Sequence, residues 1–212
     1  MRTVALVWLV VLAACGAALV RPSRLSVPDD IGSLVIDDAA FTSFAIGLAR
    51  DVDVGLAQTP NDKDRLFVRA MLAALGDRWE VAVADLDRVR AIETDPRMKV
   101  MTGLSIRIWA DAIGHGGDTP DSFRAALERS LATLPIALVH DDLAQLRAMG
   151  HTFTPEICRG LVGGAVRPVR GTVSFDDAQA IVFQRYAVKR LVAVGAILDE
   201  VLSAHGIELP TE

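Results

Sequence analysis

The chain has 212 residues, of which 51% are hydrophobic and 23% are charged. This length is sufficient for one domain with a substantial core, and the composition excludes an intrinsically disordered or collagen-like chain. Lys and Arg number 22 against 27 Asp and Glu, which gives a net charge of −5. Because no basic stripe offsets this negative charge, we expect no nucleic acid among the partners.

An uninterrupted apolar segment occupies residues 3–20, directly after Arg2. A positive residue followed by an apolar run is typical of a signal peptide. Within the run, Leu12-Ala13-Ala14-Cys15 resembles the lipobox of bacterial lipoproteins. The resemblance implies cleavage before Cys15 and acylation of its thiol, so that several acyl chains hold the mature N-terminus in a membrane.

The same resemblance implies a division of the chain and a location in the cell. Residues 1–14 are the expected signal peptide, residues 15–30 a tether with two prolines, and residues 31–212 an all-helical domain. The expected place is the bacterial cell envelope, with a lipid anchor in a membrane, which is the outer membrane if the organism is Gram-negative. Two alternatives are an uncleaved membrane anchor, because the run continues past Cys15 to Val20, and a buried N-terminal helix.

Apolar residues recur at helical spacing through the first half of the domain. They predict helices over residues 38–51, 61–75, 78–93 and 97–113. Asp37 and Asp38 stand where carboxylates favour the start of a helix. In the third of these helices, the apolar spacing places Asp85 on the outer, solvated face.

Helix-start signals divide the second half of the domain. Thr119-Pro120-Asp121 and Thr154-Pro155-Glu156 each combine an N-cap residue, a proline in the first turn and an acidic residue. A shorter helix is expected over residues 140–149, and Ser174 precedes a helical pattern that continues to His205, about 45 Å long. Between the helix that starts at Thr154 and the one that starts at Ser174, three valines predict a short extended piece: Val166, Val169 and Val173. The fold class is therefore all-α, with antiparallel helical hairpins and a long C-terminal helix.

The segment containing Trp79, Ala82 and Leu86, followed by Pro96, resembles the second helix of a tetratricopeptide repeat. The resemblance implies that the small Ala82 allows two helices to cross closely, with Trp79 and Leu86 packing beside it. Stacked hairpins of this kind leave a concave face for another protein. Val89 departs from the pattern, since a small residue is usual there. An irregular antiparallel helical bundle is therefore the alternative.

Residues that could support catalysis or hold a metal are sparse. The four histidines, His115, His140, His151 and His205, form no pair at three- or four-residue spacing, which argues against a shared metal site on one helix face. We accordingly expect neither a metal nor a cofactor. Cys158 is the only thiol besides Cys15, and we expect it to be buried and inert in an amphipathic helix.

Several cations gather near the C-terminal helix of this acidic chain. The candidate basic patch consists of Arg167, Arg170, Arg185, Lys189 and Arg190. Such a patch would face anionic lipid or an acidic partner. The alternative is an ordinary solvated helix face.

The sequence therefore predicts a lipid-anchored helical scaffold that holds another envelope protein at the membrane. The alternative is a bundle that binds a small molecule or lipid, or an enzyme without a recognisable motif. An internal cavity lined by Trp109, Phe123 and Tyr186 would favour the alternative, whereas an exposed apolar groove would favour the scaffold.

Overall fold

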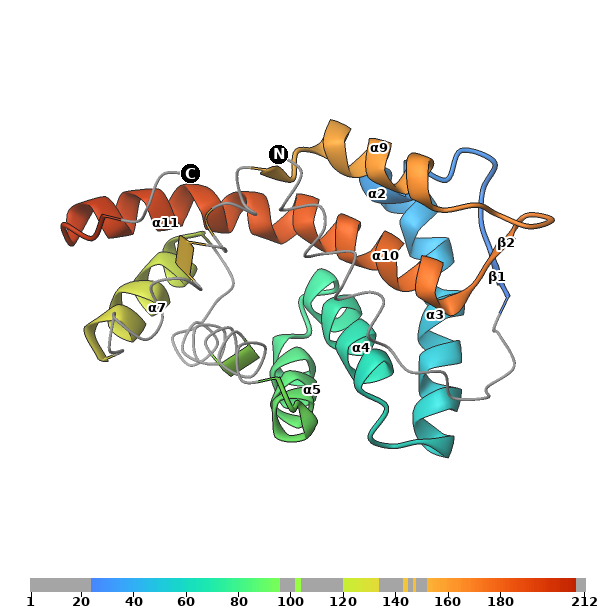
Figure 1. Cartoon of the computed structure of the whole chain (residues 1–212), viewed down its shortest axis with the longest axis horizontal. Helices are drawn as coiled ribbons and strands as arrows, with labels where there is room; N and C mark the ends of the chain where they lie inside the picture. The colour runs from blue at the N-terminus through green and yellow to red at the C-terminus, as the bar shows by residue number, and fades with distance from the viewer. Residues whose placement is uncertain are drawn as a thin grey trace.

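A computed structural model describes residues 24–95, 102–103, 120–133, 143–144, 147 and 152–208. Within these ranges the fold is all-α apart from one two-stranded sheet, which confirms the predicted fold class (Figure 1). The elements in chain order are β1 (Leu25–Ser26), α2 (Ser33–Ile36), α3 (Asp38–Gln58), α4 (Lys63–Leu75), α5 (Trp79–Ile92), α7 (Pro120–Thr133), α9 (Pro155–Ala165), β2 (Thr172–Val173), α10 (Phe175–Tyr186), the π-helical turn η1 (Ala187–Leu191) and α11 (Val192–Ala204).

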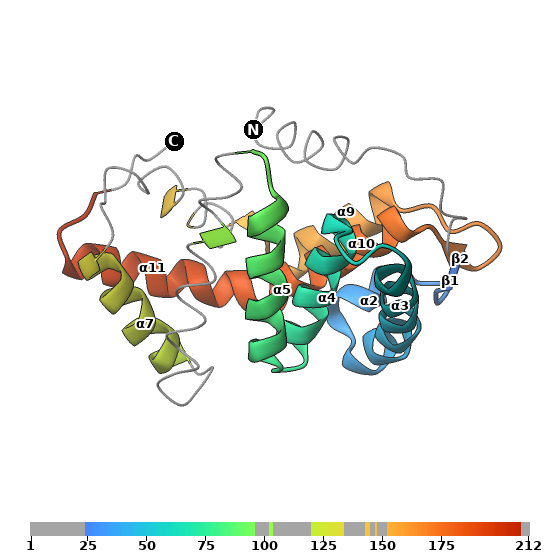
Figure 2. The same cartoon turned by 90° about the horizontal axis from the view of Figure 1, so that it is seen from below.

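The C-terminal helix forms the long axis of the molecule. α10, η1 and α11 follow one another as a single rod in both views (Figures 1 and 2). α2, α4 and α9 pack against α10, and α7 packs against α11. In Figure 1, α9 lies above the rod and α4 and α5 lie below it. The predicted long helix is therefore confirmed, with a π-helical turn in its middle.

Polar side chains fix the starts of four helices, because they accept hydrogen bonds from backbone N–H groups that have no partner within the helix. Thr154 caps α9 and Ser174 caps α10, as the sequence predicts. Asp37 caps α3 and Asp62 caps α4. α3 continues beyond its predicted end at residue 51, because its buried face extends over one more stretch to Leu56.

One hydrophobic core joins the N-terminal and C-terminal parts of the chain. Leu34 of α2, Leu48 of α3, Leu66 of α4 and Ile181 of α10 are all fully buried in it. Cys158 of α9 is fully buried as well, which confirms the expected environment of this thiol. Apolar burial from four helices around α10 is the main stabilising contribution to this part of the fold.

The small sheet corrects the expected boundary of the domain. β1 pairs antiparallel with β2 in the register Leu25↔Val173 and Ser26↔Thr172. Leu25 is buried in the core cluster, so the fold begins before the expected start at Ile31. Two-residue strands are too short for an alternating pattern to indicate them, although the extended piece predicted around Val169 and Val173 is confirmed by β2 and its adjoining bridge.

Several expectations fall outside the described residues. These are the apolar segment 3–20 and nearly all of the helices predicted over residues 97–113 and 140–149. None of the described helices has both the length and the apolar character that a membrane span requires.

Candidate functional site

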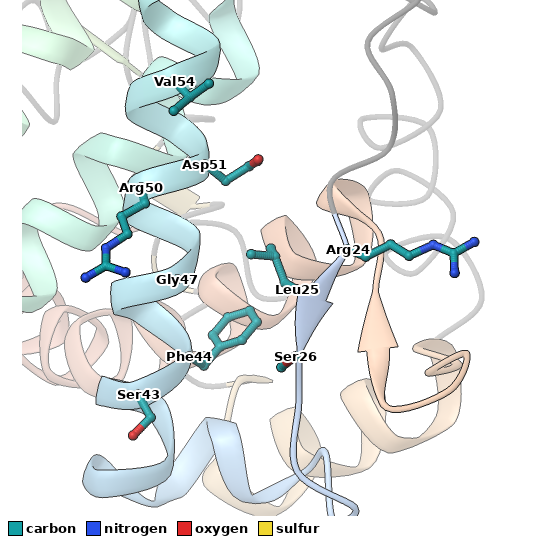
Figure 3. A pocket seen from close by; sticks show the side chains of 9 residues that line it. All are labelled: Arg24, Leu25, Ser26, Ser43, Phe44, Gly47, Arg50, Asp51 and Val54. Atoms are coloured by element: carbon teal, nitrogen blue, oxygen red, sulfur yellow. The ribbon is translucent and has the colours of Figure 1, made fainter.

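An open groove lies where β1 meets α3 (Figure 3). Its volume is about 500 Å³. α3 presents one line of side chains toward β1, and the two elements pack against each other. The groove is lined by Arg24, Leu25, Ser26, Ser43, Phe44, Gly47, Arg50, Asp51 and Val54.

The groove combines apolar walls with unneutralised polar groups. Leu25 and Phe44 are buried at its base, whereas Val54 is 60% exposed at its rim. One carboxylate oxygen of Asp51 is buried and has no hydrogen-bonding partner among the described residues. Such an oxygen is costly to bury unless a donor reaches it. Asp51 therefore adds an unsatisfied hydrogen-bond acceptor to the lining of the groove.

Two hydroxyl groups and one carboxylate line the groove. These belong to Ser26, Ser43 and Asp51, and the lining contains no histidine, lysine or cysteine. In the part of the chain that the structure describes, no three His, Cys, Asp or Glu side chains are placed to hold a metal ion. The groove offers apolar contact, hydrogen bonds and charge to an occupant.

The structure buries two of the three predicted helix-packing residues of α5. Ala82 is fully buried and Leu86 is 4% exposed, and α5 packs closely along α4. Trp79 is half-buried at the start of α5. These residues hold α5 in place, and Ala82 and Leu86 offer little surface to a partner.

A buried ion pair between α4 and α5 contradicts the expected solvated position of Asp85. Asp85 is 2% exposed and accepts two hydrogen bonds from Arg69, each 2.7 Å long. The paired geometry makes this a strong charge-assisted contact. The prediction was wrong because Arg69 of α4 supplies a partner for the buried carboxylate.

The five cations of the predicted basic patch do not share one exposed surface. Arg185 is 4% exposed, donates a 2.9 Å hydrogen bond to the carbonyl of Val35, and pairs with Asp38. Burial lowers the pKa of the Arg185 guanidinium, and the charge of Asp37 opposes this shift. Lys189 also lies 3.1 Å from Asp38. The patch prediction is therefore wrong for Arg185, which is buried. Lys189 is exposed and pairs with Asp38 at the start of α3.

Arg190 likewise points into the molecule. Its guanidinium donates a 2.9 Å hydrogen bond to the carbonyl of Ala74, pairs with Asp77, and lies 5.0 Å from the centre of the Trp79 ring. The last contact is a cation–π interaction. Arg190 thus fastens η1 to the turn between α4 and α5.

Arg167 and Arg170 are exposed members of the predicted patch that pair with no carboxylate among the described residues. Arg167 donates to the carbonyls of Gly163 and Val166 at the end of α9. Arg170 is exposed in the turn before β2, where its φ is 54° and that of Gly171 is 71°. Neither arginine has a carboxylate partner among the described residues. They differ in this respect from Arg185, Lys189 and Arg190.

The remaining predicted residues are placed only in part. Cys15, Trp109, His115, His140 and His151 lie outside the described residues, and so does the side chain of Phe123. Tyr186 is buried, and burial raises the pKa of its hydroxyl. A cavity between Trp109, Phe123 and Tyr186, which would favour the small-molecule alternative, therefore lies outside what the structure describes.

No family model matches the chain, and neither the curated proteins nor the solved structures contain a match. The groove was not predicted from the sequence. It depends on contact between β1 and α3, which no local sequence pattern indicates. Burial of Leu25 beside α3 creates it, and nothing in the residues around Leu25 indicates that contact.

Proposed function

We propose that this protein is a lipid-anchored component of the bacterial cell envelope, and that its helical domain binds another envelope protein in the groove between β1 and α3. The lipobox-like Leu12–Cys15 sequence supports the anchor. The residues between Cys15 and Leu25 span at most about 35 Å when fully extended. The groove would therefore be held near the membrane surface, within reach of other envelope proteins.

The composition of the groove carries the proposal of a protein partner. It is open to the surface and combines apolar walls with Arg24, Arg50 and the unpartnered oxygen of Asp51. Apolar contact surrounded by charged and hydrogen-bonding groups is typical of a protein interface.

The test compares two substitutions of exposed valines. Val54→Arg places a large cation in the groove, whereas Val81→Arg places the same cation on α5, outside the groove lining. Both positions are exposed, so we expect both variants to fold with unchanged thermal unfolding. Affinity capture from solubilised envelopes should recover a specific protein with the native chain and Val81→Arg, and lose it with Val54→Arg.

Equal recovery with both variants would contradict the groove as the binding site. Recovery of no specific protein by the native chain would contradict the proposal of a protein partner. Circular dichroism of the three proteins separates loss of binding from loss of fold.

The groove also supports a second candidate, the binding of a small molecule. Its volume of about 500 Å³ lies in the range of ligand pockets, and Asp51 offers a ready hydrogen-bond acceptor. Native mass spectrometry of the purified chain would show a bound small molecule in this case. Asp51→Asn should then release it, while no protein is captured.

A further inference from the structure

The outward side of α9 is apolar and unpartnered in the described structure. Its members are Ile157, Gly160, Leu161 and Gly164, which recur at positions that share one helix face. Ile157 is 45% exposed and Leu161 is 46% exposed. We call these four residues the α9 outer face. The opposite side of the helix carries Cys158 and Val162, which are buried in the core.

Glycines make the α9 outer face flat. A Cβ atom added at Gly160 or Gly164 would meet nothing within 4 Å. Packing inside the described domain therefore does not explain why glycine stands at these positions, although alanine is more favourable within a helix. The result is a smooth and uncharged strip with two large apolar side chains.

Charge is segregated along the same part of the chain. Residues 157–175 contain three arginines and no Asp or Glu, in a protein whose net charge is −5. Arg159 pairs with Asp30. Arg167 and Arg170 have no carboxylate partner among the described residues, and Val169 beside them is 60% exposed. Apolar residues and cations without a described carboxylate partner therefore occur together at the end of α9 and in the turn that follows it.

This surface lies at the end of the molecule where the proposed anchor enters. β1, the first described strand, pairs with β2, and β2 directly follows the Val169–Gly171 turn. Figure 1 shows this turn projecting beyond the helices beside the two strands. A short tether from Cys15 would hold this end of the domain closer to the membrane than the opposite end.

We propose that the α9 outer face and the Val169–Arg170 turn rest on the membrane surface, with Arg167 and Arg170 among anionic lipid head groups. This inference rests on the proposed lipid anchor. Ile157, Leu161 and Val169 enter the boundary between head groups and acyl chains, as the apolar side of an interfacial helix does. Arg167 and Arg170 have no carboxylate partner among the described residues. They favour a lipid surface over a second protein helix, because anionic lipids attract such cations.

The experiment uses the full chain, expressed and extracted with its lipid and reconstituted into vesicles. Leu161→Cys carries an environment-sensitive fluorophore on the α9 outer face, and Val81→Cys carries it on α5, on the other side of the rod in Figure 1. Native Cys158 does not compete for the label, because it is buried and burial raises its pKa to about 11. The thiol of Cys15 is acylated in the proposed mature protein.

Brominated lipids quench only a fluorophore that touches the bilayer. We expect quenching at Leu161→Cys and none at Val81→Cys in vesicles that contain phosphatidylglycerol. Arg167→Gln with Arg170→Gln should reduce the quenching at Leu161→Cys, since each cation strengthens attraction to an anionic surface about fivefold. Replacing Gly160 and Gly164 with alanine should leave it unchanged, because lipid accommodates two added methyl groups.

Other outcomes overturn the inference in distinguishable ways. If both labelled proteins sediment with vesicles and neither is quenched, the anchor stands and the docking surface is wrong. If neither sediments, the proposed anchor itself fails. Loss of quenching on replacing Gly160 and Gly164 with alanine would contradict the proposed lipid contact, because fluid lipid accommodates the added methyl groups.

Discussion

The buried position of Arg65 depends on the absence of a side chain at Gly55. It is 7% exposed, pairs with Asp62, and lies 4.9 Å above the ring of Phe175. Its stem crosses α3 at Gly55, where a Cβ atom would lie 1.9 Å from the Arg65 Nε. Gly55 therefore makes the room that the ion pair and the cation–π contact require.

Gly55→Ala should destabilise the domain by about 1–3 kcal/mol, because the new methyl group forces the buried Arg65 away from its partners. Gly47→Ala in the same helix is the matched control. Its Cβ would meet only a Leu25 methyl group at 3.9 Å, so it should stabilise the domain by about 0.5–1 kcal/mol. Urea unfolding followed by circular dichroism gives both values. Equal effects of the two substitutions would contradict the role assigned to Gly55.

At the scale of residues, local interactions could be predicted from the sequence and distant ones could not. Thr154 and Ser174 cap helices through backbone groups three residues away, so the sequence nearby contains both partners. Arg185 and Asp85 find their partners on other helices. Because both side chains are charged, the sequence predicts that they are exposed to solvent. Their hydrogen-bonding partners on other helices become evident only from the fold.

Among the elements, α10 depends on a single side chain at its start. The Ser174 hydroxyl accepts a hydrogen bond from the backbone N–H of Asp177 and donates one to its carboxylate. α10 packs against α2, α4 and α9, and the strand β2 ends directly before the cap. Fraying of this first turn would therefore loosen contacts with several elements.

Ser174→Ala should lower the free energy of unfolding by about 1 kcal/mol, since it removes the acceptor for an unpaired helix N–H. Ser203→Ala in α11 is the control, because Ser203 is exposed near the end of its helix. It should change stability by less than about 0.5 kcal/mol. Thermal unfolding of the two variants beside the native chain measures the difference, and a cost at Ser203 equal to that at Ser174 would refute the capping role.

The helices themselves follow from apolar periodicity and their start signals, but their ends and the small sheet do not. α3 runs on to Gln58, past the end expected at residue 51. Its buried face continues through Val52, Gly55 and Leu56. β1 exists only because β2 lies beside it, so no local property of Leu25 and Ser26 distinguishes them from a tether.

For the whole molecule, the all-α class and the long C-terminal rod could be predicted, whereas the binding groove could not. The rod follows from a run of helical residues without proline from Phe175 onward. The groove requires β1 to be brought onto α3 by pairing with a strand from the far end of the sequence. Long-range pairing of this kind depends on the assembled core and not on the local sequence.

The proposed anchor is tested independently of the folded domain, because Cys15 lies before the first described element, β1. Mass spectrometry of the membrane-extracted native chain should find an N-terminus at Cys15 with added acyl mass. Cys15→Ser should abolish both the processing and the acyl mass, since the hydroxyl does not replace the thiol that receives the lipid. Thermal unfolding of the domain should be unchanged, because its core begins at Leu25. A native chain that retains Met1 and carries no lipid would exclude a lipoprotein and favour an uncleaved apolar anchor.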